Sequence, residues 1–310
     1  MNDRPAKVLI TGGSGMVGRN LQEHEAAGKW DIHAPSSKDV DLTDWDATRE
    51  YVREIAPDCV VHAAGLVGGI QANMARPTDF LTQNMQMGMN LINAAREAGV
   101  PRLINIGSSC MYPRNAPNPL REEQILDGEL EPTNEGYALA KICAARLCQY
   151  IRSEDSGFNY KTLIPCNLFG RHDSFAEGKS HLIPAIIVKM QNALKNGDRE
   201  VEIWGDGTAR REFMYASDLA DAVWKNASDQ SDLPQEMNIG VGQDHSINDY
   251  YAAVAKVVGW EGEFVHDLSK PVGMKQKLVD VTRQKKWGWM PATSLVDGLT
   301  KTTKFYLEES

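Results

Sequence analysis

The chain has 310 residues, of which 42% are hydrophobic, 24% charged and 7% aromatic. This is the composition of a globular protein, and it excludes a disordered, collagen-like or coiled-coil chain. The formal net charge of -9 argues against binding to nucleic acid or to an anionic membrane. The length predicts one large α/β unit or two domains that share a cleft.

The chain carries no apolar run of membrane-spanning length, and its first residues do not form a signal-peptide pattern. Its cysteines are odd in number and lack paired metal-binding spacing: Cys59, Cys110, Cys143, Cys148 and Cys166. In a chain without an export signal, such cysteines are expected to be reduced thiols. We therefore predict a soluble, cytoplasmic protein without a bound metal.

The strongest local pattern lies near the N-terminus. Lys7–Thr11 is a short apolar run that leads into Gly12-Gly-Ser-Gly15-Met-Val-Gly18, and an amphipathic stretch follows through Ala27. In a strand–turn–helix unit, Gly12 permits the tight turn, Gly15 lets a pyrophosphate approach backbone N–H groups, and Gly18 lets the helix pack on the strand. A glycine triplet also occurs in plain tight turns, but its flanking strand and helix favour a dinucleotide site.

Short apolar or β-branched runs alternate with helical patterns along the first half of the chain. The expected strands are 30–34, 59–63, 103–106 and 162–165, and the expected helices include 46–55 and 85–98. This alternation predicts an α/β fold, a Rossmann-type doubly wound parallel sheet with a smaller C-terminal α/β substrate lobe. We expect residues 1–170 to form the nucleotide-binding domain and 171–310 mainly the substrate lobe, with a segment near 212–240 returning to the first domain.

Tyr137 and Lys141 are four residues apart in a helical stretch, so both project from one face. A phenol has an ordinary pKa of about 10, and a neighbouring ammonium would lower that pKa towards the neutral range. Such pairs also arise on helix faces without a function. Because a dinucleotide turn lies upstream, we interpret this pair as an acid–base site.

Ser108 and Cys110 follow the predicted strand 103–106, and a long irregular stretch, 112–134, comes after them. Ser108 is a candidate donor to a substrate carbonyl, or alternatively a cap that closes the strand. Cys110 is a candidate acid–base group, or alternatively a small buried hydrophobe, as we assign the other four cysteines. Loops as long as the stretch that follows are usually functional.

Motifs along nearly the whole chain resemble the GDP-L-fucose synthases, which are extended short-chain dehydrogenases. The matching strings are Val67-Gly-Gly-Ile70, Gly107-Ser-Ser-Cys-Met-Tyr-Pro113, Glu131-Pro-Thr-Asn-Glu-Gly-Tyr-Ala-Leu-Ala-Lys141, Asn167-Leu-Phe-Gly-Arg-His-Asp173, Ser180-His-Leu-Ile-Pro-Ala185, Trp204-Gly-Asp-Gly-Thr208, Arg211-Glu-Phe213 and Leu278-Val-Asp-Val-Thr-Arg283. These enzymes epimerise C3 and C5 of GDP-4-keto-6-deoxymannose and reduce C4.

The resemblance implies that Ser108, Tyr137 and Lys141 act in the reduction, and that Cys110 and His181 exchange protons during epimerisation. Protons at C3 and C5 are acidified by the C4 ketone. Inversion needs a proton removed from one face and returned on the other, which a thiol and an imidazole can perform near neutral pH. The remaining histidines are left without a role.

The resemblance also implies contacts with NADP(H) and with a GDP-linked 4-keto sugar. The cofactor-binding set is Gly12, Ser14, Gly15, Met16, Val17, Gly18, Ser37, Lys38, Asp41, Leu42, Ala63, Ala64, Gly65, Ile106, Gly107, Lys141, Pro165, Leu168 and His181. The substrate-binding set is Ser109, Asn167, Lys189, Trp204 and Arg211. An arginine fork is a suitable partner for a diphosphate in an acidic protein, whereas Trp204 is equally well explained as a core aromatic.

The chain departs from the family pattern at two places. Ser14 and Ser37 stand where the family commonly has arginines for the 2′-phosphate of NADP, but Ser36, Ser37 and Lys38 could hold a phosphate. No acid follows the second strand to favour NAD, so NADP(H) remains the predicted cofactor. Val272 replaces a family Asp, and residues 274–276 replace Thr-Pro-Arg, which leaves the identity of the sugar open.

We therefore predict an NADPH-dependent 3,5-epimerase and 4-reductase of a GDP-4-keto-6-deoxy sugar. The alternatives are a C4 reductase of another GDP-4-keto sugar, such as a GDP-heptose or GDP-colitose precursor, and a non-catalytic nucleotide sensor on the same fold. The resemblance further implies a homodimer, and the stretches 85–95 and 138–147 are rich in Ala, Met and Leu.

Overall fold

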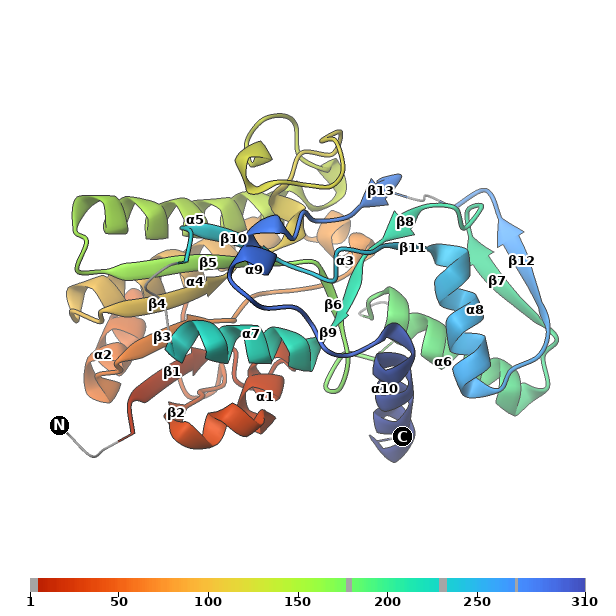
Figure 1. Cartoon of the computed structure of the whole chain (residues 1–310), viewed down its shortest axis with the longest axis horizontal. Coiled ribbons are helices and arrows are strands. Elements are labelled where there is room, and N and C mark those ends of the chain that lie inside the picture. Colours follow the sequence, from red (N-terminus) through yellow and green to blue (C-terminus); the bar gives the residue numbers. More distant parts are fainter. Residues whose placement is uncertain (1–4, 177–179, 229–232, 271–272, 310) are drawn as a thin grey trace.

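The computed structural model describes residues 5–176, 180–228, 233–270 and 273–309. Figure 1 shows a large α/β layer that contains the N-terminal half of the chain, with a smaller group of elements beside it. A loop that spans residues 112–131 projects from the edge of the molecule between these two parts.

A six-stranded parallel sheet forms the larger part, in the order β10-β5-β4-β3-β1-β2. In chain order its strands are β1 (Lys7–Thr11), β2 (Asp31–His33), β3 (Cys59–His62), β4 (Arg102–Ile106), β5 (Asn159–Pro165) and β10 (Glu236–Ile239). Because β2 and β3 lie on opposite sides of β1, the chain crosses from one half of the sheet to the other between these two strands. The carboxyl ends of all six strands meet at one edge, where ligands bind in such folds.

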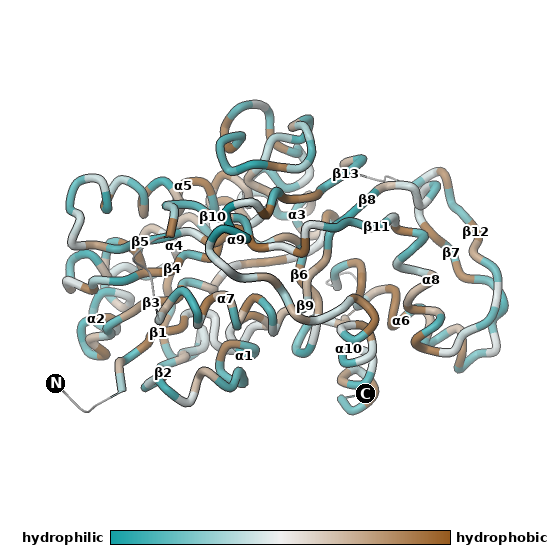
Figure 2. The backbone as a smooth tube through the Cα atoms, in the orientation of Figure 1, coloured by the Kyte–Doolittle hydropathy of each residue, from teal (hydrophilic) through white to brown (hydrophobic). Residues whose placement is uncertain are grey.

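Each face of this sheet has its own hydrophobic core. Alternate side chains of β1 point to opposite faces, so Val8 and Ile10 lie in one core and Leu9 lies in the other. Helices α2 (Trp45–Ile55), α4 (Pro77–Glu97) and α5 (Glu135–Glu154) cover the Leu9 face, and α1 (Met16–Glu23) and α7 (Ala216–Ser228) cover the other. The apolar strands beneath polar outer helix faces are visible in Figure 2.

The smaller part surrounds a third hydrophobic core. Its helices are α6 (Leu182–Asn196), α8 (Ile247–Val258) and α10 (Leu295–Glu309). Two of its sheets have two strands each: β7 (Glu200–Trp204) pairs with β12 (Glu263–Asp267), and β6 (Asn167–Phe169) pairs with β9 (Phe213–Tyr215). In a third sheet, β8 (Arg210–Arg211) lies between β11 (His245–Ser246) and β13 (Gln276–Lys277). These short sheets bring segments from distant parts of the chain together beside the carboxyl edge of the main sheet (Figure 1).

Short helical elements complete the fold. They are η1 (Glu25–Lys29), α3 (Ile70–Ala75), η2 (Ser109–Met111), η3 (Glu122–Gln124), η4 (Pro132–Asn134) and α9 (Thr282–Lys286). The projecting loop is tied to the C-terminal segment, because Leu120 forms a β-bridge with Val279. The Tyr112 hydroxyl also donates to Asn238 Oδ1 at 2.6 Å.

The predicted fold class is confirmed, whereas two helix boundaries differ from the prediction by several residues. The first helix ends at Glu23 rather than Ala27, because His24 is extended and its Nδ1 accepts a hydrogen bond from Ala26 N that caps η1. The fourth helix begins at Pro77 rather than residue 85, since proline fits the first helical turn. Within 212–240, strand β10 is an edge strand of the main sheet, and helix α7 packs on that sheet.

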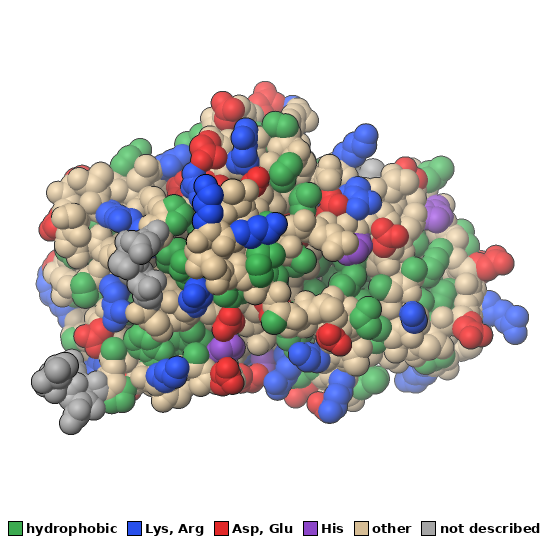
Figure 3. All heavy atoms as spheres, in the orientation of Figure 1, with side chains coloured by type: hydrophobic (Ala, Val, Ile, Leu, Met, Phe, Trp, Pro, Cys, Tyr) green, Lys and Arg blue, Asp and Glu red, His purple; other side chains and the backbone are tan. Residues whose placement is uncertain are grey.

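None of the helices in the described ranges is long and apolar enough to span a membrane. Lysines and arginines are interspersed with aspartates and glutamates over the face drawn in Figure 3. On this face, a bound anion would be held by local donors rather than by a uniformly basic surface.

Candidate active site

The glycine turn between β1 and α1 is built for close backbone approach. Gly12 has a φ of +72°, and a Cβ there would lie 2.8 Å from backbone atoms of Ala64. A Cβ on Gly18 would lie 2.2 Å from the Gly12 carbonyl oxygen, so this glycine allows α1 to pack against the turn. A Cβ on Gly15 would meet only the Gly12 oxygen, at 3.4 Å, so the protein itself does not fill this position.

Gly15 is the N-cap of α1 and provides no side-chain hydrogen bond to the first N–H groups of the helix. The first turn also carries no acidic residue. Open N–H groups and the helix dipole favour an anion at this end, so the turn fits a dinucleotide pyrophosphate. The predicted contacts Ser14, Met16 and Val17 lie in the same turn.

The other predicted cofactor residues are distributed along the same edge of the sheet. Ala63, Ala64 and Gly65 follow β3, Ile106 ends β4 and precedes Gly107, Pro165 ends β5, and Leu168 lies in β6. In a parallel sheet these positions are adjacent in space although they are far apart in the sequence. The structure therefore gives the residues that end or follow β3, β4 and β5 one common edge, whereas Leu168 lies in the separate sheet of β6 and β9.

The turn after β2 holds the residues predicted near the 2′-phosphate. The Ser36 hydroxyl and backbone N–H both donate to Asp39 Oδ2, each at 2.7 Å. Ser36 therefore stabilises the turn, and the side chains of Ser37 and Lys38 remain exposed. Asp41 Oδ1 accepts from Thr43 N at 2.9 Å and Thr43 Oγ1 at 2.7 Å, and these bonds hold the pKa of Asp41 below its usual value. Leu42 is buried.

Ser108, Tyr137 and Lys141 meet where the end of β4 faces α5. The Ser108 and Tyr137 side chains are hydrogen-bonded. Lys141 Nζ donates to the Ile106 carbonyl at 2.9 Å and lies 5.8 Å from the centroid of the Tyr137 ring. Ser108 also caps η2, with its Oγ accepting from Cys110 N at 3.2 Å. The cap alternative therefore describes a real contact, but the serine contacts the tyrosine as well.

The electrostatics of this pair differ from the prediction. Burial raises the pKa of Tyr137, and the neighbouring Cys110 raises it further. Burial lowers the pKa of Lys141 to about 8. The expected lowering of the Tyr137 pKa by Lys141 is wrong for this arrangement, because desolvation of the phenolate is the dominant effect.

Cys110 is partly buried at the border of the first hydrophobic core and also has polar neighbours. Its Sγ accepts a hydrogen bond from Asn134 Nδ2 at 3.1 Å and from Lys277 Nζ at 3.5 Å. Cys59, Cys148 and Cys166 are buried, and burial raises the pKa of Cys59 to about 12. Cys110 therefore packs against the first hydrophobic core and also receives two polar contacts, so both the packing role and the acid–base role stay open for it.

His181 lies at the N-cap of α6, and burial lowers its pKa. The preceding residue approaches the loop at Gly69, where an added Cβ would be 3.7 Å from the Ser180 carbonyl oxygen. Within the described ranges, no hydrogen bond or ion pair joins His181 to Cys110. The structure therefore does not bring the predicted epimerase pair into direct contact.

Lys189 and Trp204 meet at β7 in the smaller part. Lys189 Nζ donates to the Glu202 carbonyl at 2.7 Å, and Trp204 Nε1 donates to Glu202 Oε1 at 2.9 Å. Lys270 Nζ lies 5.6 Å from the Trp204 ring centroid. Trp204 is 43% exposed, which excludes the core-aromatic alternative.

Arg211 and Asn167 are joined through the residue between β8 and β9. Asn167 Nδ2 donates to the Glu212 carbonyl at 2.8 Å, and Arg211 precedes Glu212 in the chain. Burial lowers the pKa of Arg211, while the nearby Glu131 opposes this effect. Ser109 is buried in η2. Val272, which marks the departure near the sugar, lies outside the described residues.

Sequence reasoning missed three residues at this site: Asn134, Glu212 and Lys277. Asn134 lies in a matched string, so the resemblance could have assigned it a role. The buried Glu212 carboxylate accepts from Val241 N, Gly242 N and Val279 N, at 2.7, 2.7 and 2.9 Å. Glu212 also lies in a matched string, whereas no matched string contains Lys277, whose partners are distant in the sequence.

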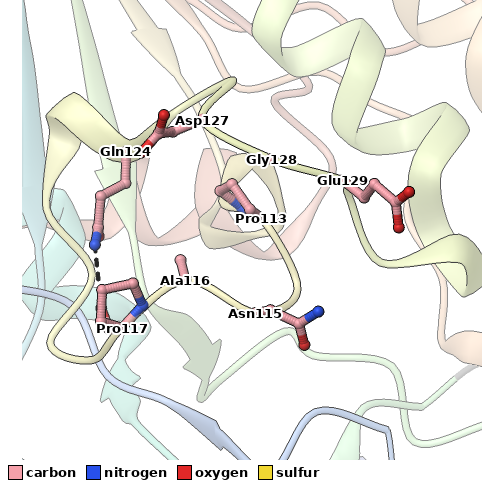
Figure 4. A pocket seen from close by; sticks show the side chains of 8 residues that line it. All are labelled: Pro113, Asn115, Ala116, Pro117, Gln124, Asp127, Gly128 and Glu129. Carbon is pink, nitrogen blue, oxygen red and sulfur yellow. Dashed lines mark hydrogen bonds between the residues drawn. The ribbon is translucent and has the colours of Figure 1, made fainter.

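A separate pocket of about 270 Å³ lies within the projecting loop. It is lined by Pro113, Asn115, Ala116, Pro117, Gln124, Asp127, Gly128 and Glu129. Figure 4 shows the Gln124 side chain reaching the Pro117 carbonyl, a hydrogen bond of 3.2 Å. This pocket contains none of the predicted cofactor, substrate or catalytic residues.

The fold and this constellation define a class of protein: a dinucleotide-binding α/β enzyme with a Ser-Tyr-Lys site. The profile described as NAD dependent epimerase/dehydratase family matches residues 8–240. The chain belongs to this family.

Two curated relatives are each 50% identical to this chain. One is a GDP-L-colitose synthase from Yersinia pseudotuberculosis, aligned over 98% of this chain and 98% of its own length. The other is a GDP-L-fucose synthase from Azorhizobium caulinodans, aligned over 97% of this chain and 96% of its own length. The predicted resemblance to the GDP-L-fucose synthases is thereby confirmed.

A solved structure shares the whole architecture. It is a GDP-D-glycero-L-gluco-heptose synthase from Campylobacter jejuni in the presence of NADPH. Its sequence is 30% identical, the TM-score is 0.90, and the alignment covers 97% of this chain and 98% of that chain.

Proposed function

We propose that this protein binds NADPH and a GDP-4-keto-6-deoxy sugar, inverts C3 and C5, and reduces C4 to give GDP-L-fucose. The observation that carries the proposal is Cys110, a thiol in a polar site close to Ser108 and Tyr137. A reductase alone needs the Ser-Tyr-Lys group, whereas a second proton-exchanging group is what epimerisation adds.

The described residues divide the work. The glycine turn would hold the pyrophosphate of NADPH, which supplies the hydride, and the exposed Ser37 and Lys38 would face the 2′-phosphate. Ser108 and Tyr137 would bind the C4 oxygen, and Tyr137 would deliver its proton. Cys110 and His181 would exchange protons beside the ketone. Support for NADPH comes from the heptose synthase structure solved in its presence.

The substrate lobe would hold the GDP part. Arg211 and Lys189 would meet the diphosphate, Ser109 and Asn167 the sugar, and the exposed Trp204 a flat base. A second candidate is the reduction of a GDP-colitose precursor, because the colitose synthase has the same identity to this chain as the fucose synthase. Colitose lacks the 3-hydroxyl group, so its formation requires inversion only at C5.

We also propose a cytoplasmic homodimer. Its support is the packed pair α4 and α5, which carries the Ala-, Met- and Leu-rich stretches, and the five cysteines, all of which are free thiols. Light scattering at micromolar concentration should give twice the chain mass of 34.3 kDa, and a monomer would contradict the proposal.

Two variants test the proposed chemistry. Tyr137→Phe removes the proton donor for reduction, so NADPH turnover should fall by about 10²–10⁴-fold. Cys110→Ser keeps the Ser-Tyr-Lys group, so NADPH should still be consumed and a 4-reduced sugar without inversion should form. The products are identified by NMR with GDP-4-keto-6-deoxymannose and its 3-deoxy analogue as substrates.

Deuterium exchange isolates the epimerisation step. In D₂O without NADPH, wild-type protein should introduce deuterium beside the ketone and Cys110→Ser should introduce little. His181→Asn should allow partial exchange, since the thiol still removes a proton. If Cys110→Ser exchanges and inverts the sugar at the wild-type rate, the role assigned to Cys110 is wrong.

A further inference from the structure

Lys277 is a buried cation that meets the sulfur of Cys110. Its side chain comes from β13, 167 residues away in the sequence, and its Nζ lies 3.5 Å from Sγ. Lys277 is only 9% exposed, and within the described ranges no carboxylate lies at ion-pair distance from it. Buried charges are normally paired, because an ammonium without a counter-ion loses its hydration without compensation.

The segment that carries Lys277 is held on both sides. Glu212 N donates to the Lys277 carbonyl at 3.2 Å, and the Glu212 carboxylate accepts from Val279 N. On the other side, Leu278 N donates to Asn118 Oδ1 at 2.8 Å, and Leu120 N donates to the Leu278 carbonyl at 2.7 Å. Lys277 is therefore a fixed part of the site rather than a flexible surface lysine.

Asn134 completes the contacts of the sulfur. Its Nδ2 donates to Sγ at 3.1 Å, while its Oδ1 is buried and has no hydrogen-bond partner in the described part of the chain. Two donors thus converge on one sulfur, and one of them carries a positive charge. Hydrogen-bond donors and cations stabilise a thiolate relative to a thiol.

We propose that Lys277 is a positioning residue for epimerisation, whose ammonium holds Cys110 Sγ, orients it towards the sugar and stabilises negative charge on the sulfur when the thiol reacts. This inference rests on the proposed function, since it assigns Cys110 the role of the base. The step breaks the C–H bond beside the ketone. The electron pair of that bond forms the enolate, the proton moves to Sγ, and the negative charge passes from sulfur to the enolate oxygen. Lys277 retains all of its protons.

The first test needs no sugar. Alkylation of Cys110 by iodoacetamide at pH 7 is followed by peptide mass spectrometry in wild type, Lys277→Met, Lys277→Gln and Lys277→Arg. Loss of the charge should slow alkylation on the order of tenfold or more, and arginine should restore part of the rate. Lys275→Met is the matched control, because Lys275 is exposed on the same segment and should react as wild type.

The second test uses the sugar. Deuterium uptake from D₂O into GDP-4-keto-6-deoxymannose without NADPH should slow in Lys277→Met and Lys277→Gln by a factor similar to that for alkylation. Thermal unfolding midpoints establish whether the compared variants are folded. If either Lys277→Met or Lys277→Gln misfolds, the other variant, which differs from it in polarity, still tests the proposal. If Cys110 is alkylated at the wild-type rate in both Lys277→Met and Lys277→Gln, the proposal is overturned. So would an increase in KM for the sugar nucleotide with unchanged alkylation, since Lys277 would then bind the diphosphate.

The two proposals fail in different ways. If wild-type protein introduces no deuterium into any GDP-4-keto sugar but alkylation still depends on Lys277, the proposed function is wrong and the ion pair stands. If wild-type protein exchanges deuterium and the Lys277 variants match it in both assays, the proposed function stands and the role of Lys277 is wrong.

Discussion

Gly18→Ala should uncouple the glycine turn from the helix that follows it. The added Cβ would lie 2.2 Å from the Gly12 carbonyl oxygen and 2.7 Å from the Gly13 Cα. Both neighbours are backbone atoms, so no flexible side chain can move aside. Relief of the contact requires α1 to shift by about 1 Å, within an interior packed as densely as a crystal.

This shift has a cost in stability and a cost in binding. Overpacking of this kind destabilises by about 1–3 kcal/mol, which urea unfolding can measure. The same movement displaces the N–H groups proposed for the pyrophosphate, so the Kd for NADPH should rise by about tenfold or more. Fluorescence titration of NADPH on folded protein measures this second effect separately from the first.

Gly28→Ala provides the matched control. A Cβ at Gly28 would have no heavy atom within 4 Å, although this glycine lies only ten residues further along the chain. Both its unfolding midpoint and its Kd for NADPH should remain close to wild type. If Gly18→Ala behaved like Gly28→Ala in both assays, the close approach of α1 to the turn would have no energetic consequence and our reasoning would be refuted.

Two further predictions concern pH and cofactor choice. Burial raises the pKa of Glu212 from 4.5 to about 7. The folded state therefore binds a proton at Glu212 more tightly than the unfolded chain does. The free energy of unfolding should fall as the pH rises from 4.5 to 7, by about 3 kcal/mol in all. Urea unfolding should show that Glu212→Gln loses this pH dependence; an unchanged dependence would contradict it. Wild-type protein should have a higher kcat/KM with NADPH than with NADH. Ser37→Arg should increase the ratio of these two kcat/KM values, because a charge-assisted hydrogen bond is roughly twice as strong as a neutral one. A wild-type preference for NADH would overturn this prediction.

Local patterns predicted most of the α/β sheet, because a buried strand or an amphipathic helix is encoded by neighbouring residues. The strand Lys7–Thr11 was predicted with its observed bounds. The strand predicted at 103–106 begins one residue earlier in the structure, at Arg102. The end of α1 was not predicted, because it depends on the hydrogen bond that Ala26 N donates to the His24 side chain. The Tyr137 pKa was not predicted either, since desolvation depends on what surrounds the hydroxyl.

The sequence by itself determined the dinucleotide turn and the helical spacing of Tyr137 and Lys141, because each is contained in a few consecutive residues. It also determined the family resemblance, because that rests on short strings of residues along the chain. Only the tertiary structure decided what surrounds Cys110. Lys277 and Asn134 reach its sulfur from different segments, and Glu212 fixes the strand that carries the lysine. Contacts across such sequence separations arise from the packing of the two parts of the fold, and no local periodicity encodes them.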